Sequence, residues 1–436
     1  MIIENWILSI IPSLALLSLA QFANRKFGSW LAPSAFFGFY WGVSLLTTLI
    51  LAPSFGFWPG AAWFILFLGC AFHLGVMIGT NKHRFSSKMH KKSTRYIFYK
   101  LRWGKQIVTI SALFGLLASY ILASRVIHPS SILSDPTIII QIGRSYAKMR
   151  YVYGQGQPLI VSILNAFLYF GSIYAGAWLA TRPFKRFRIF CILPLLVGLL
   201  QAVLTSARTG TIWLFTLFIA GYLATLVLNH RHINFLTIKR IIIIILILSL
   251  FVIHFFLLQV AREDRGFQEY QMKTRVSMLS SPVAFSNWLK EKGSYVRPAW
   301  GAKTFGGLFD LLGIAERRQA LGWEGSMIIV DGQEFFPNVY TAFRQLIEDF
   351  TIVGALIVFV GWGVLIGKAY RAVLNGKTTY LPLLVLFYGT TLGSYLANWL
   401  NYNSLLFGWL LFLFSSFKIV PRLLHSSVYG QSPRVR

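Results

Sequence analysis

The feature that most constrains this chain is a series of long apolar runs separated by short polar loops. Each run has about 17–24 residues, enough for one helix to cross a hydrocarbon core of about 30 Å. Lipid offers no water to satisfy the backbone, so a chain crossing it forms helices. We therefore expect about eleven transmembrane helices, at 5–22, 29–51, 60–79, 105–125, 157–180, 189–206, 211–229, 241–260, 348–370, 379–397 and 403–419.

The charge distribution agrees with a membrane protein. Only 12% of the residues are charged and 56% are apolar, whereas about a quarter of a soluble domain is charged. The net charge of +28 is of the kind that nucleic-acid-binding proteins carry. Here, however, the basic residues crowd into short loops between the apolar runs, which is the positive-inside pattern. We expect an all-α polytopic protein whose partner is the lipid bilayer, with no nucleic acid.

The orientation follows from the alternation of the loops. All 13 Asp and Glu residues lie on the side opposite the most basic loops, which are 23–28, 80–105, 181–188, 230–240, 368–378 and the tail from 418. The basic side is expected to be cytoplasmic. Arg25 and Lys26 follow the first apolar run instead of preceding it, which predicts an uncleaved first helix rather than a signal peptide. The N-terminus is then periplasmic and the C-terminus cytoplasmic.

The outer loops are unequal in length. Segment 261–347 is much the longest, and its many Trp, Phe, Tyr, Leu and Gly residues are atypical of disorder. We expect a periplasmic cap with short helices around Val283–Glu291 and Thr304–Ile314. The chain then divides into a bundle of about eight helices at 1–260, the cap at 261–347, and about three helices with a tail at 348–436.

The turn Thr205–Gly210 joins two apolar runs at the outer boundary and contains Arg208. An arginine there can extend its side chain to lipid headgroups. Alternatively, its guanidinium and the backbone donors of a tight Ser/Thr/Gly turn form an anion site. The local sequence favours neither interpretation.

Two further basic groups lie at outer helix ends. Arg262 and Arg265 are three residues apart after the run at 241–260, so they share a helix face, with Glu263 and Asp264 between them. A solvated helix end is the favoured interpretation of each of these residues, and a binding site is the alternative.

Arg144, Lys148 and Arg150 alternate with tyrosines in loop 126–156. This pattern suits an anionic or sugar-bearing ligand. An interfacial aromatic belt is the alternative interpretation.

The segment that leads back into the membrane contains Asn338, Tyr340, Arg344, Glu348 and Asp349. Arg344 and Glu348 are four apart and can pair across one helical turn. A carboxylate at position 349 suits a helix N-terminus. Capping and a surface ion pair would explain the two acids, but not the aromatic and amide residues before them.

Several residue types are absent where other functions would need them. The outer face has no Asp-x-Asp pair and no His/Cys cluster, so no metal site is expected. Cys70 and Cys191 lie inside apolar runs, which implies no disulfide. The helix interiors lack Asp, Glu, Lys and Arg, which weighs against an ion-coupled transporter.

The motifs and layout resemble those of the O-antigen polymerases, the Wzy-type family of oligosaccharide repeat-unit polymerases. Thr205–Gly210 is similar to the family's Ser/Thr-rich segment ending in Arg-Thr-Gly. Asn338–Phe343 with Glu348–Phe350 and Gly354 is similar to its Asn-x-Tyr-Thr…Asp-Phe-Gly signature, although Thr351 stands where the family often has glycine. The layout of many helices with one large outer loop covers nearly the whole chain.

The resemblance implies a metal-independent glycosyltransferase of the bacterial inner membrane, without a cofactor and with the many-helix architecture of lipid-dependent (GT-C-like) glycosyltransferases. A growing glycan on undecaprenyl diphosphate is transferred to a new lipid-linked repeat unit, for O-antigen, capsule or exopolysaccharide synthesis. A chain-length regulator and a flippase are the implied protein partners.

The residue types suit this chemistry. Fixed guanidiniums at Arg208, Arg262, Arg265 and Arg344 would stabilise a leaving diphosphate. Glu348 or Asp349 would accept the hydroxyl proton. We expect the glycan and diphosphate to contact Arg144, Lys148, Arg150, Asn338 and Tyr340 as well.

Two alternatives remain. An O-antigen ligase resembles a polymerase but typically carries a histidine in the large outer loop, and segment 261–347 has none. A lipid-linked oligosaccharide flippase would be expected to lack the cap and to keep charges within its bundle.

Overall fold

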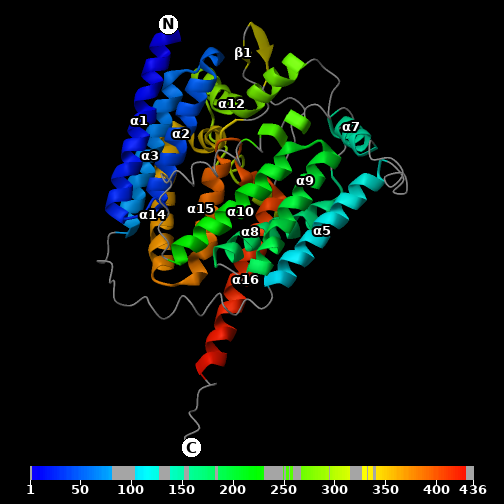
Figure 1. Cartoon of the computed structure of the whole chain (residues 1–436). Coiled ribbons are helices and arrows are strands. Elements are labelled where there is room, and N and C mark those ends of the chain that lie inside the picture. Colours follow the sequence, from blue (N-terminus) through cyan, green and yellow to red (C-terminus); the bar gives the residue numbers. More distant parts are fainter. Residues whose placement is uncertain are drawn as a thin grey trace, which may run out of the picture.

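The chain is almost entirely helical in the part that the computed structural model describes, which comprises residues 2–80, 104–126, 138–151, 157–181, 185–229, 249, 252–254, 256–258, 267–293, 295–314, 327–330, 332–336 and 340–428. Eight of the described helices are long and apolar enough to cross a membrane. A multi-pass, mostly helical membrane protein is thereby confirmed (Figure 1). Of the expected helix at 241–260, the structure describes only residues 249, 252–254 and 256–258.

Seven of the eight spanning candidates belong to the first half of the chain. The long helices before residue 230, with the short 3-10 turns between them, are α1 (Ile2–Phe27), α2 (Pro33–Leu51), η1 (Pro53–Phe55), α3 (Pro59–Thr80), α5 (Gly104–Ser124), α7 (Ile138–Tyr151), α8 (Leu159–Ala180), η2 (Lys185–Ile192), α9 (Leu193–Thr205) and α10 (Arg208–Leu228). Of these, α7 is an outer helix that does not span.

The second half contains the outer elements, the spanning candidate α14 and the helices that follow it. They are α12 (Phe267–Lys292), α13 (Gly306–Leu311), β1 (Ile328–Val330), β2 (Gln333–Phe335), α14 (Ala342–Leu374), η3 (Thr378–Tyr380), α15 (Leu381–Gly393), η4 (Trp399–Asn401) and α16 (Asn403–Val428). α15 has only 13 residues and is shorter than the sequence predicts. α16 has 26 residues and extends beyond the predicted end at 419.

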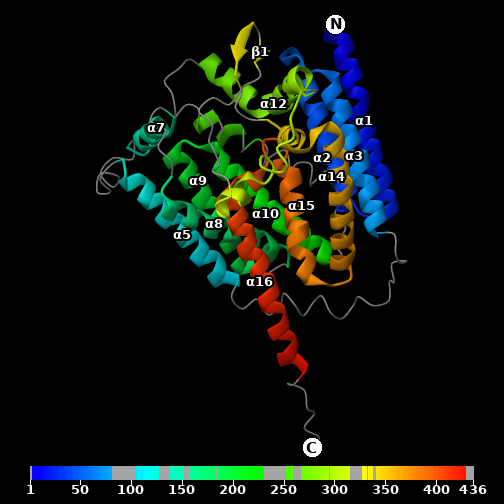
Figure 2. The same ribbon diagram turned by 180° about the vertical axis from the view of Figure 1, so that it is seen from behind.

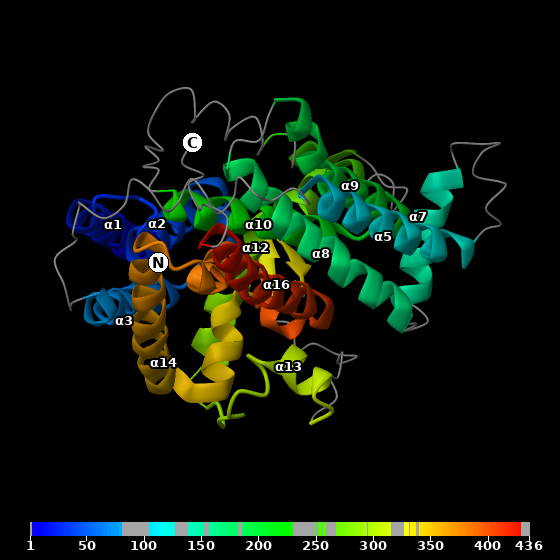
Figure 3. The same ribbon diagram turned by 90° about the horizontal axis from the view of Figure 1, so that it is seen from below.

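The helices form two groups that α15 joins. α1, α2, α3 and α14 pack together, and α5, α8, α9, α10 and α16 form the second group. α15 packs mainly on α10 and also on α14 (Figure 1, Figure 2). The two groups lie side by side when the bundle is viewed along its length (Figure 3).

Glycines permit the closest helix contact in the first group. Gly75 and Gly79 of α3 face Gly363 and Gly367 of α14. A Cβ added to Gly75 would lie 2.9 Å from the Cα atom of Gly363, and a Cβ added to Gly363 would lie 3.0 Å from the Cα atom of Gly75. Spacing by four on both helices places both pairs on one face. The register advances in the same direction on each helix, so α3 and α14 run parallel.

The second group has a comparable contact between α8 and α10. A Cβ at Gly176 would lie 1.9 Å from the carbonyl oxygen of Phe218, and one at Gly221 would lie 2.2 Å from that of Ile173. The buried Ser172 hydroxyl donates to the Leu214 carbonyl at 2.7 Å. Small residues and a polar bond replace the hydrophobic effect, which does not act between helices in lipid.

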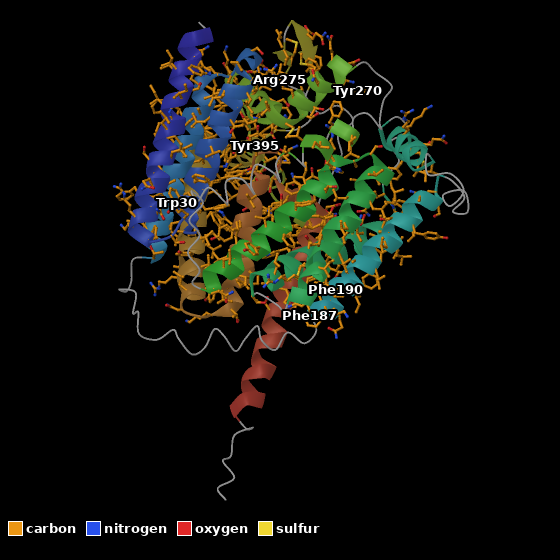
Figure 4. The ribbon with its side chains drawn as sticks, viewed as in Figure 1. Trp30, Phe187, Phe190, Tyr270, Arg275 and Tyr395 are labelled. Carbon is orange, nitrogen blue, oxygen red and sulfur yellow. The ribbon has the colours of Figure 1, made fainter. Side chains whose placement is uncertain are left out.

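An outer layer covers one end of the bundle, the end at which α1 begins (Figure 1). It contains α7, α12 and an antiparallel hairpin in which Ile328 pairs with Phe335. Arg275 of α12 donates from Nε and Nη2 to the Leu51 carbonyl at the end of α2, at 3.2 and 3.0 Å. Figure 4 shows Arg275 and Tyr270 on this outer helix. α12 and α13 cover the two places where the sequence predicts short helices.

Candidate functional site

Arg208 is the first residue of α10, directly after a sharp turn. Ser206 ends α9 in the left-handed conformation (φ 46°, ψ 28°), and Ala207 is extended. No side chain caps the start of α10, so its first backbone N–H groups have no partner within the helix. Nη1 of Arg208 is buried from solvent. A helix start that bears an arginine is suited to bind an anion.

α7 closes over this turn. A Cβ added to Gly143 would lie 2.5 Å from Oγ of Ser206 and 2.7 Å from the Val203 carbonyl, so only glycine fits here. Arg144 follows directly and is half-buried, whereas Lys148 is exposed. The structure therefore brings Arg144 close to the Arg208 turn. Arg150 lies further along α7.

Arg344 lies in the first turn of α14 within an aromatic cluster. Its Nε donates to Oε1 of Glu348 at 2.8 Å. Its guanidinium carbon lies 4.3 Å from the ring centre of Tyr340 and 5.2 Å from that of Trp288. Stacking and an ion pair together fix the plane of the guanidinium. Three residues that the sequence singled out thus meet, with Trp288 of α12 added by the fold.

Asp349 is fully buried, with none of its surface exposed. Its Oδ1 accepts from the backbone N–H of Lys303 at 3.0 Å, and its Oδ2 accepts from that of Thr304. The carbonyls of Glu348 and Asp349 accept from Ala299 and Trp300 at 3.0 and 3.2 Å. This carboxyl group therefore holds the turn 299–304 against the start of α14.

Backbone strain is concentrated at these two places. Among the described residues, the non-glycine residues with positive φ are Ser206, Trp300 and Thr351 (φ 46°, 51° and 63°). Ser206 is two residues before Arg208, Thr351 is two after Asp349, and Trp300 donates to the Asp349 carbonyl. Thr351 combines φ 63° with ψ 177° inside α14, a conformation that costs a residue other than glycine about 1–3 kcal/mol.

The two arginine-bearing helices are neighbours. α10 contacts α14, and both begin at the end of the bundle that the outer layer covers (Figure 1). Arg262, Arg265 and Asn338 lie outside the described residues. Within the described part of the chain, no group of three or more His, Cys, Asp or Glu side chains could hold a metal ion.

Sequence reasoning missed the partners that the outer segment supplies. Trp288 falls inside a predicted short helix, but nothing in its spacing pairs it with Arg344. The turn at Trp300 and Gly301 carries no recognisable motif, and its role depends on the contact with Asp349 across 45 or more positions. A lone tryptophan beside glycine in an outer loop was the only available signal.

Comparisons with known proteins add no assignment to this geometry. No protein-family model matches the chain, and neither curated proteins nor solved structures match it. The fold and site define a polytopic helical membrane protein with buried and stacked arginines at one end of its bundle. What it does is inferred from those residues and from the resemblance of its motifs.

Proposed function

We propose that this protein polymerises undecaprenyl-diphosphate-linked oligosaccharide repeat units at the periplasmic face of a bacterial inner membrane. We expect about eleven transmembrane helices and the architecture of a lipid-dependent glycosyltransferase. The observation that carries it is the grouping of Arg344, Glu348 and Tyr340 beside the buried Asp349. Tyr340, Glu348 and Asp349 belong to the motif that resembles the polymerase signature, Arg344 lies between its two parts, and all four are held by specific contacts.

The arginines would serve the leaving group. An acceptor hydroxyl attacks the anomeric carbon, the bond from that carbon to phosphate breaks, and the diphosphate leaves with the electron pair. Negative charge grows on the phosphate oxygen, where preorganised donors lower the barrier most. Arg208 at the start of α10 and Arg344, held by its aromatic neighbours, are the described candidates.

The two carboxylates would have different tasks. Asp349 already accepts one backbone N–H on each oxygen, which suits it to positioning the turn 299–304. The side chain of Glu348 keeps 21% of its surface exposed, so an incoming hydroxyl could reach it. Glu348 is therefore the proposed acceptor of the hydroxyl proton.

The distribution of basic residues supports the orientation. Arg25 and Lys26 end α1, Lys105 begins α5, and Arg371 lies in the last turn of α14. These helix ends lie opposite the outer layer (Figure 1). An inner face rich in Lys and Arg is the rule for cytoplasmic loops.

The test is the length distribution of lipid-linked glycans in cells that express Arg208→Lys or Arg208→Ala. A lysine is a point charge and cannot make the two parallel bonds of a guanidinium. Loss of one such contact lowers the rate by about 100- to 1,000-fold, so both variants should abolish the long-chain ladder at unchanged protein level. Arg297→Lys, at an exposed outer arginine, is the matched control and should leave the ladder intact.

Deletion of the gene separates the alternatives. Loss of all long chains supports the polymerase, and long chains stranded on the lipid carrier support the ligase. Repeat units trapped on the cytoplasmic leaflet support the flippase. A normal ladder from Arg208→Lys would overturn the bidentate role of Arg208.

A further inference from the structure

The segment from Ala299 to Ile314 distributes its side chains in the opposite way to a water-facing loop. Its apolar residues point outward: Trp300 is 79% exposed, Leu312 62% and Ile314 66%, and Phe305, Leu308 and Leu311 are exposed as well. Apart from exposed Lys303, its polar groups bond to the protein. Asp310 accepts from Nδ2 of Asn403, and the Thr304 carbonyl accepts from Nδ2 of Asn398 at 2.7 Å. Such a surface matches hydrocarbon better than water.

Most backbone N–H groups of this segment have partners although it forms little regular helix. The N–H groups of Ala299, Trp300, Lys303 and Thr304 donate to the carbonyl and carboxylate groups of Glu348 and Asp349. The Gly306 N–H donates to Oδ1 of Asn401 at 3.0 Å. Non-helical backbone is tolerated at membrane depth only when its polar groups find partners in the protein, and most N–H groups here do.

The neighbouring helices place the segment at the depth of the lipid chains, inside the periplasmic boundary of the bilayer. α15 has 13 residues and is therefore about 20 Å long. Exposed Lys377 and Tyr380 precede it and fit the inner headgroup level, so its outer end stops short of a hydrocarbon core of about 30 Å. α16 begins at Asn403, directly after η4 and the short segment that follows α15.

α13 packs against η4 and α16, next to the outer end of α15. A Cβ at Gly307 would lie 2.4 Å from the Leu400 carbonyl. Viewed along the bundle, α13 lies at its edge, outside α16 (Figure 3). It therefore occupies the outer rim of the bundle at the level where α15 ends and α16 begins.

We propose that Ala299–Ile314 re-enters the membrane and presents its apolar face to the lipid chains of the leaflet on the α12 side. The segment fills the depth that α15 leaves open, and its inner side is fastened to Asp349. Exposed Lys303 lies at the end nearest Asp349, from which its long stem reaches the headgroups. The outer segment 261–347 is then in part a membrane element, independently of the reaction that the protein catalyses.

Spin labels on single introduced cysteines in nanodiscs test this, because both membrane faces are then accessible. The sites are Leu312→Cys and Ile314→Cys, in a background with Cys70→Ala and Cys191→Ala. Ile329→Cys, an exposed apolar position on the outer hairpin, is the matched water-facing control. Exposed Cys70 in the middle of α3, labelled in a chain with Cys191→Ala, is the lipid-facing control.

We expect labels at 312 and 314 to resemble the label at 70, with relaxation enhanced by oxygen far more than by a water-soluble nickel chelate. The label at 329 should show the reverse. Nickel accessibility at 312 and 314 equal to that at 329 would overturn the proposal, as would low accessibility to both reagents, which marks burial in protein. A water-soluble maleimide gives a second readout and should modify 329 at least tenfold faster than 312.

Discussion

α3 with α14 and α8 with α10 are both parallel helix pairs in close contact, but they end differently. α14 continues past its glycine contact through the strained Thr351 into the outer layer. α10 starts at Arg208, at the end of a turn of two residues. One pair thus delivers carboxylates and an arginine on a bent helix, and the other delivers an arginine at a helix start. Rigid contacts deep in each pair allow irregular backbone at its outer end.

The largest effect is expected from a substitution that forces α3 and α14 apart. Gly363→Val places a branched side chain where a Cβ alone would lie 2.4 Å from the Phe72 carbonyl. We expect a loss of about 3 kcal/mol or more in the free energy of unfolding, because neither backbone can move away cheaply. The measurement is the protein level in membranes, together with thermal unfolding in detergent.

Gly361→Val is the matched control on the same helix. Nothing lies within 4 Å of a Cβ at that position, so the protein level should stay near the wild-type value. Gly221→Val should be as harmful as Gly363→Val, since its Cβ would lie 2.2 Å from the Ile173 carbonyl. Equal tolerance of all three variants would refute tight packing in both pairs.

A smaller effect is expected at Asp349, which bonds the start of α14 to the turn 299–304. Asp349→Asn puts an amide donor against one of two backbone N–H groups. An unsatisfied buried donor costs about 1–3 kcal/mol, so the turn at 299–304 should loosen. Limited proteolysis should then cut near Lys303 faster. Glu334→Gln, on the exposed hairpin, is the control. Unchanged cleavage in Asp349→Asn would argue against the role of Asp349 in holding the turn 299–304.

The smallest changes in stability are expected from relieving backbone strain, and they should differ in size between the two helix pairs. Thr351→Gly relieves a conformation that costs about 1–3 kcal/mol. Ser206→Gly relieves an ordinary left-handed one, which costs about 1 kcal/mol. Both should raise the melting temperature in detergent, and Thr351→Gly should raise it more. Thr209→Gly in the first turn of α10 should lower it slightly. A reversed order would mean that strain does not limit stability at residue 351.

The sequence predicts those features that depend on local pattern. Apolar runs locate eight spanning helices because length and hydropathy decide insertion. The spacing of Arg344 and Glu348 predicts their ion pair, which the structure confirms. The conformation at Thr351 is one that glycine adopts freely, at the position where the resembling family often has glycine.

Features that depend on contacts across the chain could not be predicted. α13 packs beside η4 and α16, and Asn398 bonds the turn 299–304, although these elements are far apart in the chain. The same contacts decide that Asp349 accepts backbone donors. Helix start preferences at position 349 suggest a cap of its own helix, whereas the carboxylate bonds a turn 46 and 45 positions earlier.

The glycine contact between α3 and α14 has a consequence for biosynthesis. α3 ends at Thr80 and α14 begins at Ala342, so the ribosome works for about 10–60 s between them at the usual 5–20 residues per second. During that interval the glycine face of α3 is inserted without its final neighbour. In nascent chains arrested before residue 342, we therefore expect the glycine face of α3 to contact a component of the insertion machinery.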